Sequence, residues 1–312
     1  MSKVDIYICS KPLQYLNICN IPSLDGNNKK ILIICNTFYK ASIFADNIRE
    51  YEKQWDKVVL VSGRNWAFHV IRYRVEKLFL GIDSTLVGVL HFVKRFKFYL
   101  YEEGAGIYNS NSNFLRIQDK YLLLARILGT GEIMGKSHYL QGIFVYYPDY
   151  YISRIHPSCP VFSFVYSYRA MIKQKVRSFL SLYNLDVNNE PFFNIYNSKI
   201  LLYITDWEFD LSIINRMEEE KDNYDYLFIK PHPHILKESI PIVKGINVLY
   251  TSLIVEIIIH IWLERGNKVT VYHQDSTAII PFGNEINSIN LNESIDSEYH
   301  QIIEELKKLS CN

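Results

Sequence analysis

Three apolar stretches near the start of the chain decide its fold: VDIYIC at residues 4–9, KILIICN at residues 30–36 and KVVLVS at residues 57–62. Each is short, rich in branched aliphatic residues and bounded by polar ones, which is typical of a buried strand. Helical patterns separate them, one from Pro12 and one over Tyr39–Tyr51. The alternation predicts βαβ units, and strands this apolar indicate a parallel sheet that is covered on both faces.

The same rhythm continues through the first half of the chain. We expect a helix over Trp66–Phe79, a strand over Lys97–Glu102, a helix near Asn113–Leu128 and a strand over Ile143–Tyr147. From Tyr150 to Ser198 the pattern loosens around three prolines, with one helix expected over Tyr168–Tyr183. This looser stretch predicts a connection between two domains.

A second βα series follows. Its strands are expected over Lys199–Thr205, Tyr226–Lys230, Val248–Tyr250 and Lys268–His273, and its helices over Phe209–Lys221, Ser252–Arg265 and Ser297–Leu309. The predicted organisation is an N-terminal α/β domain (residues 1–155), a connecting segment (156–198) and a C-terminal α/β domain (199–312). The fold class is therefore α/β, with two Rossmann-like domains that face a cleft.

Composition narrows the function classes. The 312 residues are 48% hydrophobic and 14% aromatic, enough for two cores without extended disorder. The net charge of +1, from 34 Lys and Arg against 33 Asp and Glu, gives no global attraction to nucleic acid, so any anion site is local. The five cysteines are odd in number and lack close pairs, which argues against a disulfide framework or a zinc site.

The chain also lacks the pattern of a membrane span. Its longest apolar segment, Leu253–Leu263, contains Glu256 and His260 and is shorter than the roughly 20 residues that cross a bilayer. The first apolar run is too short for a signal peptide. We expect a cytoplasmic protein, at most peripheral at the inner face of the membrane, where the basic and aromatic stretch Tyr168–Arg177 is a candidate contact.

Three short motifs carry polar chemistry, each directly after an expected strand. The first is YEEG at residues 101–104, where Gly104 permits a sharp turn and Glu102 or Glu103 can point into a cleft. A solvated acidic turn would have the same sequence. Because ligands of α/β folds bind at the carboxyl ends of strands, these carboxylates are candidate proton acceptors.

The second motif is KPHP at residues 230–233. Its two prolines, one of them Pro233, restrict the backbone around His232, and Lys230 adds a positive charge. An imidazole suits the protonation of a leaving phosphate near neutral pH. A loop histidine that only bonds its neighbours is the alternative, and His234 is a second candidate.

The third motif is DST at residues 275–277, where Ser276 and Thr277 could bind a phosphate or simply cap a helix. Glu256 stands in a very apolar helix and needs a partner, either a ribose diol or a structural ion pair. Asp206 and Asp210 follow another strand, and either could be a general base or the start of the next helix.

Several common motifs are missing from the sequence. It contains no Walker phosphate loop, no Gly-x-Gly-x-x-Gly and no Asp-x-Asp, and its histidines have no helical metal-pair spacing. We therefore expect no metal and no cofactor, and a metal-independent mechanism.

Taken in order, these motifs resemble the acidic-acidic-Gly, His-Pro and Ser/Thr-Ser motifs of bacterial sialyltransferases. The opening YICSKPLQ at residues 7–14 is similar to the start of the lipooligosaccharide sialyltransferases of glycosyltransferase family 52. The match spans most of the chain through few residues. The resemblance implies a GT-B fold, an N-terminal acceptor domain and a C-terminal domain that binds CMP-sialic acid without a metal.

By position, the resemblance implies that His232 contacts the donor phosphate and acts as general acid, with Glu256 on the ribose and Ser276 and Thr277 on the phosphate. Ser-Thr replaces the common Ser-Ser and keeps both hydroxyls. Lys230 and Pro233 are expected on the donor side, and Gln14 and Gly104 on the acceptor side. Two candidates remain for the base: Glu102 matches the acidic motif, and Asp210 lies upstream of His232, where family 52 enzymes place theirs. Glu103 is a third.

The predicted activity is inverting transfer of sialic acid from CMP-sialic acid to a terminal galactose-type hydroxyl of a bacterial lipooligosaccharide, O-antigen or capsule. Two alternatives remain open. The chain could transfer another CMP-activated acid, such as Kdo or a different nonulosonate, or it could be a catalytically silent subunit of glycan assembly. The expected partners are the donor and a galactose-terminated acceptor, with no nucleic acid, and a homodimer is expected from the resemblance.

Overall fold

The computed structural model describes residues 3–24, 27–110, 122–206, 209–232, 235, 243–292 and 298–311. The chain forms two compact units, Met1–Ser167 and Tyr168–Asn312. Residues 156–167 of the expected connecting segment thus belong to the first unit, and residues 168–198 to the second. Pro233 and His234 of the second motif lie outside the described residues.

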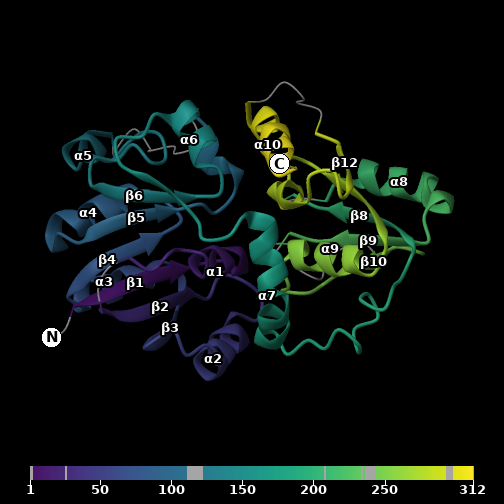
Figure 1. Ribbon diagram of the computed structural model, residues 1–312, viewed down its shortest axis with the longest axis horizontal. Coiled ribbons are helices and arrows are strands. Elements are labelled where there is room, and N and C mark those ends of the chain that lie inside the picture. Colours follow the sequence, from purple (N-terminus) through teal and green to yellow (C-terminus); the bar gives the residue numbers. More distant parts are fainter. Residues whose placement is uncertain are drawn as a thin grey trace. The chain divides into compact units, whose positions relative to one another are not determined.

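The first unit contains a seven-stranded parallel sheet with the order β3-β2-β1-β4-β5-β6-β7 (Figure 1). Its strands are β1 (Val4–Cys9), β2 (Lys29–Cys35), β3 (Lys57–Val61), β4 (Val75–Leu80), β5 (Lys97–Tyr101), β6 (Leu140–Val145) and β7 (Val161–Ser163). Its helices are α1 (Pro12–Ile18), α2 (Ala41–Tyr51), α3 (Trp66–Arg72), α4 (Thr85–Lys94), α5 (Leu122–Ile127) and α6 (Pro148–Ile155). Every residue of β1 is buried, as a central strand covered on both faces requires.

The second unit contains a five-stranded parallel sheet with the order β10-β9-β8-β11-β12 (Figure 1). Its strands are β8 (Lys199–Ile204), β9 (Tyr226–Lys230), β10 (Asn247–Val248), β11 (Lys268–His273) and β12 (Asn287–Asn290). Its helices are α7 (Tyr168–Leu182), α8 (Leu211–Glu219), α9 (Val255–Glu264) and α10 (Glu298–Leu309), with a 3₁₀ helix over Thr277–Phe282. Leu201, Ile229 and Tyr272 lie in its core, which α8 covers through Ile214 and Met217.

Each sheet has one place where the strand order reverses. In the first, the chain builds outward from β1 through β2 to β3, and then returns to the other side of β1 with β4. In the second it builds from β8 through β9 to β10, and returns beside β8 with β11. The connections on the two sides of such a point leave in opposite directions, so a crevice opens at the carboxyl ends of the strands, where α/β proteins bind ligands.

Some expected elements are wrong. The predicted helix Trp66–Phe79 ends at Arg72, and Val75–Leu80 is the strand β4, which pairs with β1 and β5. The helices α4 and α6 and the short polar strand β12 were not predicted. Of the helix expected near Asn113–Leu128, the described part contains α5, and residues 113–121 lie outside the described residues.

The α/β prediction is confirmed, with a parallel sheet in each unit. Within the part of the chain that the structure describes, no helix has both the length and the apolar character needed to cross a membrane.

Candidate functional site

The carboxyl ends of β1, β4 and β5 meet at the reversal point of the first sheet, and polar side chains gather there. Glu103 lies just beyond β5, and its Oε1 accepts a bond from Lys11 Nζ at 3.3 Å while its Oε2 accepts one from Gln14 Nε2. Gln14 Oε1 in turn accepts bonds from the backbone N–H of Ser10 at 2.5 Å and from its hydroxyl at 2.9 Å. The loop after β1 and the start of α1 therefore hold the partly exposed carboxylate that follows β5.

Two glycines make room for this arrangement. A Cβ at Gly81, directly after β4, would lie 2.9 Å from Glu103 Oε2, closer than such atoms come, and 3.1 Å from Gln14 Nε2, a tight contact. Gly104 has φ +153° and ψ −177°, a conformation that residues with a side chain avoid. The turn after YEEG thus depends on glycine, and a side chain at position 81 would displace the Glu103 carboxylate.

Glu102 lies in a different environment from its neighbour. It is buried, and its Oε2 accepts bonds from the Tyr108 hydroxyl at 2.5 Å and from the Tyr146 N–H at 2.9 Å. Burial raises the pKa of Glu102 to about 7, although both bonds oppose the rise. Its role in the structure is to tie the end of β5 to the end of β6, whereas Glu103 has a side chain that is 31% exposed.

The reversal point of the second sheet lies between β8 and β11, and Asp210 is close to it. Asp210 caps α8, since its Oδ1 accepts bonds from the Ser212 N–H at 2.9 Å and the Ser212 hydroxyl at 2.6 Å. Its Oδ2 accepts a bond from Gln274 Nε2 at 3.2 Å, at the end of β11. The bonds from Ser212 hold the pKa of Asp210 below its usual range, which makes this carboxylate a weak proton acceptor.

The end of β9 carries the second motif. The His232 N–H donates to the Thr205 hydroxyl at 2.8 Å, which fixes the loop against the end of β8. Lys230 is buried and donates to the Thr251 carbonyl at 2.9 Å, so it clamps two loops together rather than facing solvent. Burial lowers the pKa of Lys230 to about 8, and the charge of Glu256 opposes that shift.

Glu256 lies in the first turn of α9 and is buried. Its Oε1 accepts a bond from the Tyr168 hydroxyl at 3.0 Å. The pKa of Glu256 is raised, because burial outweighs the opposing effect of the Lys230 charge. The sequence left two kinds of partner open for this carboxylate, a ribose diol or a group of the protein itself. The structure contains a partner of the second kind, the Tyr168 hydroxyl. A ribose contact by Glu256 remains a prediction.

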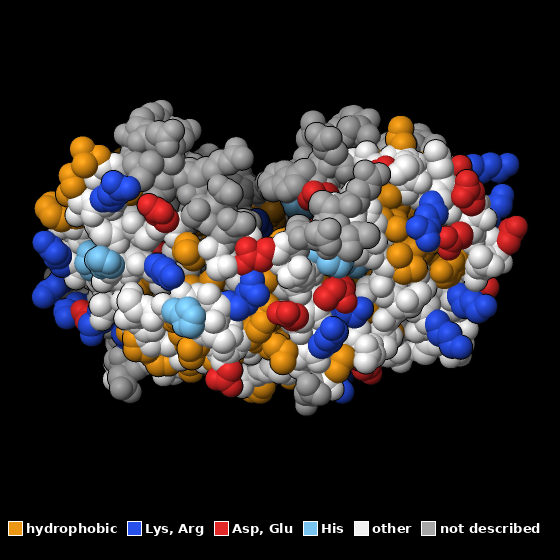
Figure 2. Space-filling view, turned by 90° about the horizontal axis from the view of Figure 1, so that it is seen from above, with side chains coloured by type: hydrophobic (Ala, Val, Ile, Leu, Met, Phe, Trp, Pro, Cys, Tyr) orange, Lys and Arg blue, Asp and Glu red, His pale blue; other side chains and the backbone are white. Residues whose placement is uncertain are grey.

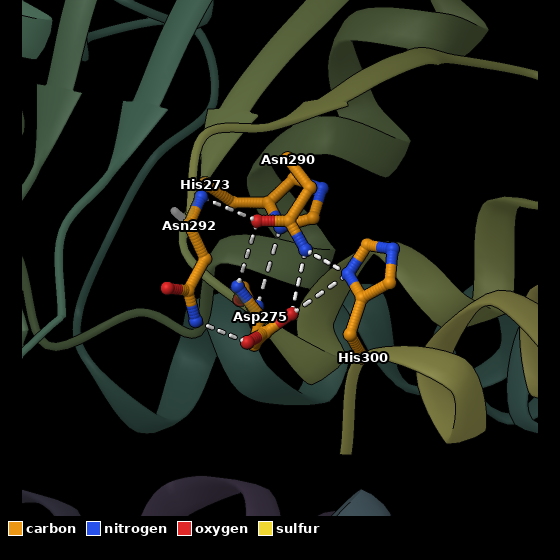
Figure 3. Close-up of polar contacts among 6 residues, drawn as sticks. His273, Asp275, Asn290, Asn292 and His300 are labelled. Carbon is orange, nitrogen blue, oxygen red and sulfur yellow. Dashed lines mark hydrogen bonds and ion pairs between the residues drawn. The ribbon is translucent and has the colours of Figure 1, made fainter. Parts of the chain in front are cut away.

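The third motif follows β11, and Figure 3 shows the contacts around it. Asp275 has φ +53°, a left-handed conformation that is uncommon for residues other than glycine. Its Oδ1 accepts a bond from Asn290 Nδ2 at 2.6 Å and lies 3.1 Å from His300 Nδ1, and its Oδ2 accepts a bond from Asn292 (Figure 3). Side chains from the end of β12 and from α10 therefore hold this turn in its strained shape.

The turn presents Ser276 in a defined way. The Ser276 N–H donates to His273 Nδ1 at 3.3 Å, and the Ser276 hydroxyl oxygen accepts a bond from the Ala278 N–H at 3.4 Å. Ser276 thus caps the 3₁₀ helix that begins at Thr277. His273 is fully buried, and its burial lowers the pKa of the imidazole to about 4, so His273 is neutral at physiological pH.

The structure relates the predicted residues through their strands. His232 follows β9 and Ser276 follows β11, with β8 between them. Two strand spacings amount to about 10 Å, a span within reach of a nucleotide with its phosphate. Glu102, Glu103, Gly104 and Gln14 belong to the first unit, and Glu256, Ser276 and Thr277 to the second.

Sequence reasoning missed several residues of these two clusters. Ser10 and Lys11 were part of a quoted motif without a role, and Gly81 follows a strand that was predicted as helix. Asn290 ends the unpredicted strand β12 and Asn292 follows it, while His300 lies in α10, a predicted helix to which no role was given. Among the described residues, no group of three or more His, Cys, Asp or Glu side chains is arranged to hold a metal ion.

No family model matches the chain. No curated protein matches it either. Solved structures do share its fold. The UDP-N-acetylglucosamine 2-epimerase of Rickettsia bellii aligns over 94% of this chain and 80% of its own, with a TM-score of 0.56 and 14% identity. The UDP-GlcNAc 2-epimerase of Neisseria meningitidis aligns over 98% and 91%, with a TM-score of 0.52 and 12% identity.

A sugar transferase is similar to the same extent. The spinosyn forosaminyltransferase SpnP aligns over 99% of this chain and 91% of its own, with a TM-score of 0.51 and 9% identity. At such identities the likeness establishes the fold. The chain has the GT-B fold, in agreement with the expectation from its motifs.

Proposed function

We propose that the protein is a metal-independent glycosyltransferase that acts on a nucleotide-activated sugar, with CMP-sialic acid as donor and a galactose-type hydroxyl as acceptor. One observation carries the proposal: the candidate acid and base groups follow strands at or beside the reversal points of the two sheets, the places where α/β proteins bind ligands. The GT-B neighbours, which include two UDP-sugar epimerases and a sugar transferase, support a sugar nucleotide as substrate.

Glu103 is our choice of base. Its carboxylate is partly exposed and is oriented by Gln14 and Lys11, whereas Glu102 is buried. Both oxygens of Asp210 accept hydrogen bonds, as those of Glu103 do, but the bonds from Ser212 lower the pKa of Asp210 and weaken it as a base. The structure thus favours the third of the sequence candidates over the first two.

In the proposed step the Glu103 carboxylate takes the proton of the acceptor hydroxyl. The acceptor oxygen forms a bond to the anomeric carbon of the donor sugar while the bond from that carbon to the CMP phosphate oxygen breaks, which inverts the anomeric configuration. His232 gives a proton to the departing phosphate. The products are the glycoside and CMP, and the protonated Glu103 and the neutral His232 then exchange protons with water.

The second unit would stabilise the leaving group. The Ser276 and Thr277 hydroxyls are our candidates for the phosphate contacts, and Glu256 for the ribose. Lys230 is buried under the His232 loop, where its charge favours a phosphate at a distance and its bond to Thr251 keeps the loop in place. Pro233 would restrict that loop further.

The acceptor is the less determined partner. We propose a galactose-terminated lipooligosaccharide, O-antigen or capsule glycan, with the protein working as a cytoplasmic enzyme at the inner face of the membrane. Kdo or another CMP-activated nonulosonate is the alternative donor, since the CMP contacts would be unchanged. A catalytically silent subunit of glycan assembly is the alternative from a different function class, and a homodimer remains a prediction from the resemblance.

The test is a donor panel with the purified chain: CMP-sialic acid, CMP-Kdo and UDP-GlcNAc, each with lactose and other terminal galactosides. We expect CMP release and a sialylated product from the first donor, lost in His232→Ala and kept in His138→Ala, which changes an exposed histidine. Consumption of CMP-Kdo alone would establish the alternative donor. CMP binding by calorimetry without turnover would indicate the silent subunit, and conversion of UDP-GlcNAc alone would overturn the proposal.

A further inference from the structure

Three helices of the first unit, α3, α4 and α5, expose large apolar side chains. α4 packs against both α3 and α5, so the three helices form one continuous surface, named here the α3–α5 face. Its exposed apolar residues are Phe68, Ile71, Val89, Phe92, Val93, Leu123, Leu124 and Ile127. Single exposed apolar residues are common, but a contiguous group marks an interaction site.

The most prominent of these side chains are well out in solvent. Phe68 is 65% exposed, Phe92 62% and Val93 64%, while Leu123 and Ile127 are each 72% exposed. All five lie on helices that pack into the unit through their opposite sides. The buried residues of those sides are Trp66, Val70, Val87, Leu90 and Ala125. The exposed residues are therefore surplus to the core of the unit.

Positive charges stand directly beside the apolar residues. Lys94 and Arg95 follow Phe92 and Val93, and the Arg95 guanidinium lies 5.3 Å from the centre of the Phe92 ring. Arg126 lies between the exposed leucines and isoleucine of α5, and Arg72 ends α3. None of the three helices contains Asp or Glu.

Among the other described α-helices, α1 and α7 share this lack of Asp and Glu, and the rest do not. The helix α2 of the same unit has Asp46 and Glu50 on its exposed side, and α8 and α10 of the second unit also carry acidic residues. Figure 2 shows orange and blue side chains together at the left end of the view, the end of the first unit where Figure 1 labels α4 and α5.

We propose that the α3–α5 face docks on an anionic lipid bilayer. Phe and Leu side chains with Lys and Arg beside them are the pattern of helices that lie in a membrane interface. Long cationic side chains can reach the headgroups while their apolar neighbours enter the acyl region. The four cations Arg72, Lys94, Arg95 and Arg126, with no acidic residue on the three helices, complement the negative charge of an anionic lipid surface.

The stretch expected to contact the membrane, Tyr168–Arg177, is less suitable. Its large apolar residues Tyr168, Met171 and Ile172 are buried, and α7 packs against α9. What that stretch exposes is polar, including Lys173 and Arg177. Unlike this stretch, the α3–α5 face combines charge with exposed apolar area.

The experiment is cosedimentation of the full chain with vesicles of phosphatidylcholine alone or with phosphatidylglycerol. We expect binding to the anionic vesicles only, weakened by salt. Phe92→Glu should weaken that binding about tenfold or more, because it removes a side chain that enters the acyl region on docking and adds a repelled charge. Arg95→Gln should weaken it about fivefold.

Tyr51→Glu is the matched control. It makes the same kind of change at a 55% exposed aromatic residue of α2, outside the α3–α5 face, and should bind as the unchanged chain does. Circular dichroism checks that each variant is folded.

Three results of the vesicle experiment would overturn the proposal: the folded chain binds neither kind of vesicle, it binds both kinds equally, or the Phe92→Glu variant binds as well as the unchanged chain. It is also overturned if light scattering finds a dimer that Phe92→Glu dissociates, since a second copy would then occupy the face. None of these readouts uses catalysis, so they are independent of the proposed activity.

Discussion

The buried carboxyl of Glu102 predicts a pH dependence of stability in the first unit. Its pKa is raised from 4.5 to about 7 in the folded state, mainly by burial. Between these values the folded unit binds a proton that the unfolded chain has released, so stability falls as pH rises. The contribution of Glu102 to the free energy of unfolding is fully present below about pH 4.5 and is lost progressively as the pH rises to about 7. Above that pH it changes no further. At 1.36 kcal/mol for each pH unit, the loss amounts to about 3 kcal/mol.

The perturbation that isolates this effect is Glu102→Gln. Glutamine is neutral, has nearly the same size and can still accept the bond from the Tyr108 hydroxyl. The variant should therefore lack the decline, and at pH 8 it should be more stable than the unchanged chain by up to about 3 kcal/mol. Glu50→Gln, at an exposed position of α2, should leave the decline as it is.

Because the chain has two units, one global unfolding curve would mix their transitions. The assay is hydrogen exchange by mass spectrometry at increasing urea, from pH 4.5 to 8, followed in peptides from β5 and β6. Peptides from β8 and β11 report the second unit as an internal reference. A difference between the unchanged chain and Glu102→Gln that does not vary with pH would refute the reasoning, as would a difference of opposite sign.

Three further predictions concern the reaction. Glu103→Gln should lower kcat by about 10²- to 10⁴-fold with little change in the KM for the donor, as loss of a general base does. Steady-state kinetics over a series of donor concentrations measures both constants, and an unchanged kcat would exclude Glu103 as the base. Asp210→Ala should cost about 1 kcal/mol of stability through loss of the α8 cap and leave most of kcat, whereas a fall of a hundredfold or more would make Asp210 the base. His300→Ala should raise the donor KM about tenfold without a comparable loss of kcat, because it removes a partner of the Asp275 carboxylate that holds the Ser276 turn. Rescue by His300→Gln would support a positioning role for His300 over a chemical one.

The fold could be predicted from the sequence where a segment satisfies only one pattern. The strand over Val4–Cys9 is apolar along its whole length and is bounded by polar residues, so it fits no amphipathic helix. Residues 75–80 satisfy two patterns, because Val75, Leu78 and Phe79 have helical spacing. Their conformation is decided by pairing with β1 and β5, which depends on residues distant in the sequence.

The candidate site could be predicted as a set of motifs but not ranked. Glu102 and Glu103 are adjacent and chemically alike, and their difference arises from Tyr108 and Tyr146, the latter 44 residues away. A side chain in place of Gly81 would also displace the Glu103 carboxylate, and Gly81 follows a strand that was predicted as helix. Burial and close approach of this kind are properties of the assembled sheet, and neither leaves a local pattern.

The DST motif had two interpretations, a helix cap or a phosphate site, and the contacts of Ser276 make them compatible. A hydroxyl has one hydrogen to donate and two lone pairs that accept. The bond from the Ala278 N–H uses one lone pair of the Ser276 oxygen, so the cap leaves the hydroxyl hydrogen available to a phosphate oxygen. The cap also fixes the rotamer of the side chain, and the carboxylate of Asp275 fixes the turn that carries it through Asn290, Asn292 and His300. A hydroxyl that is already oriented loses less entropy when it binds, which is the condition under which one hydrogen bond to a leaving group adds most to the rate.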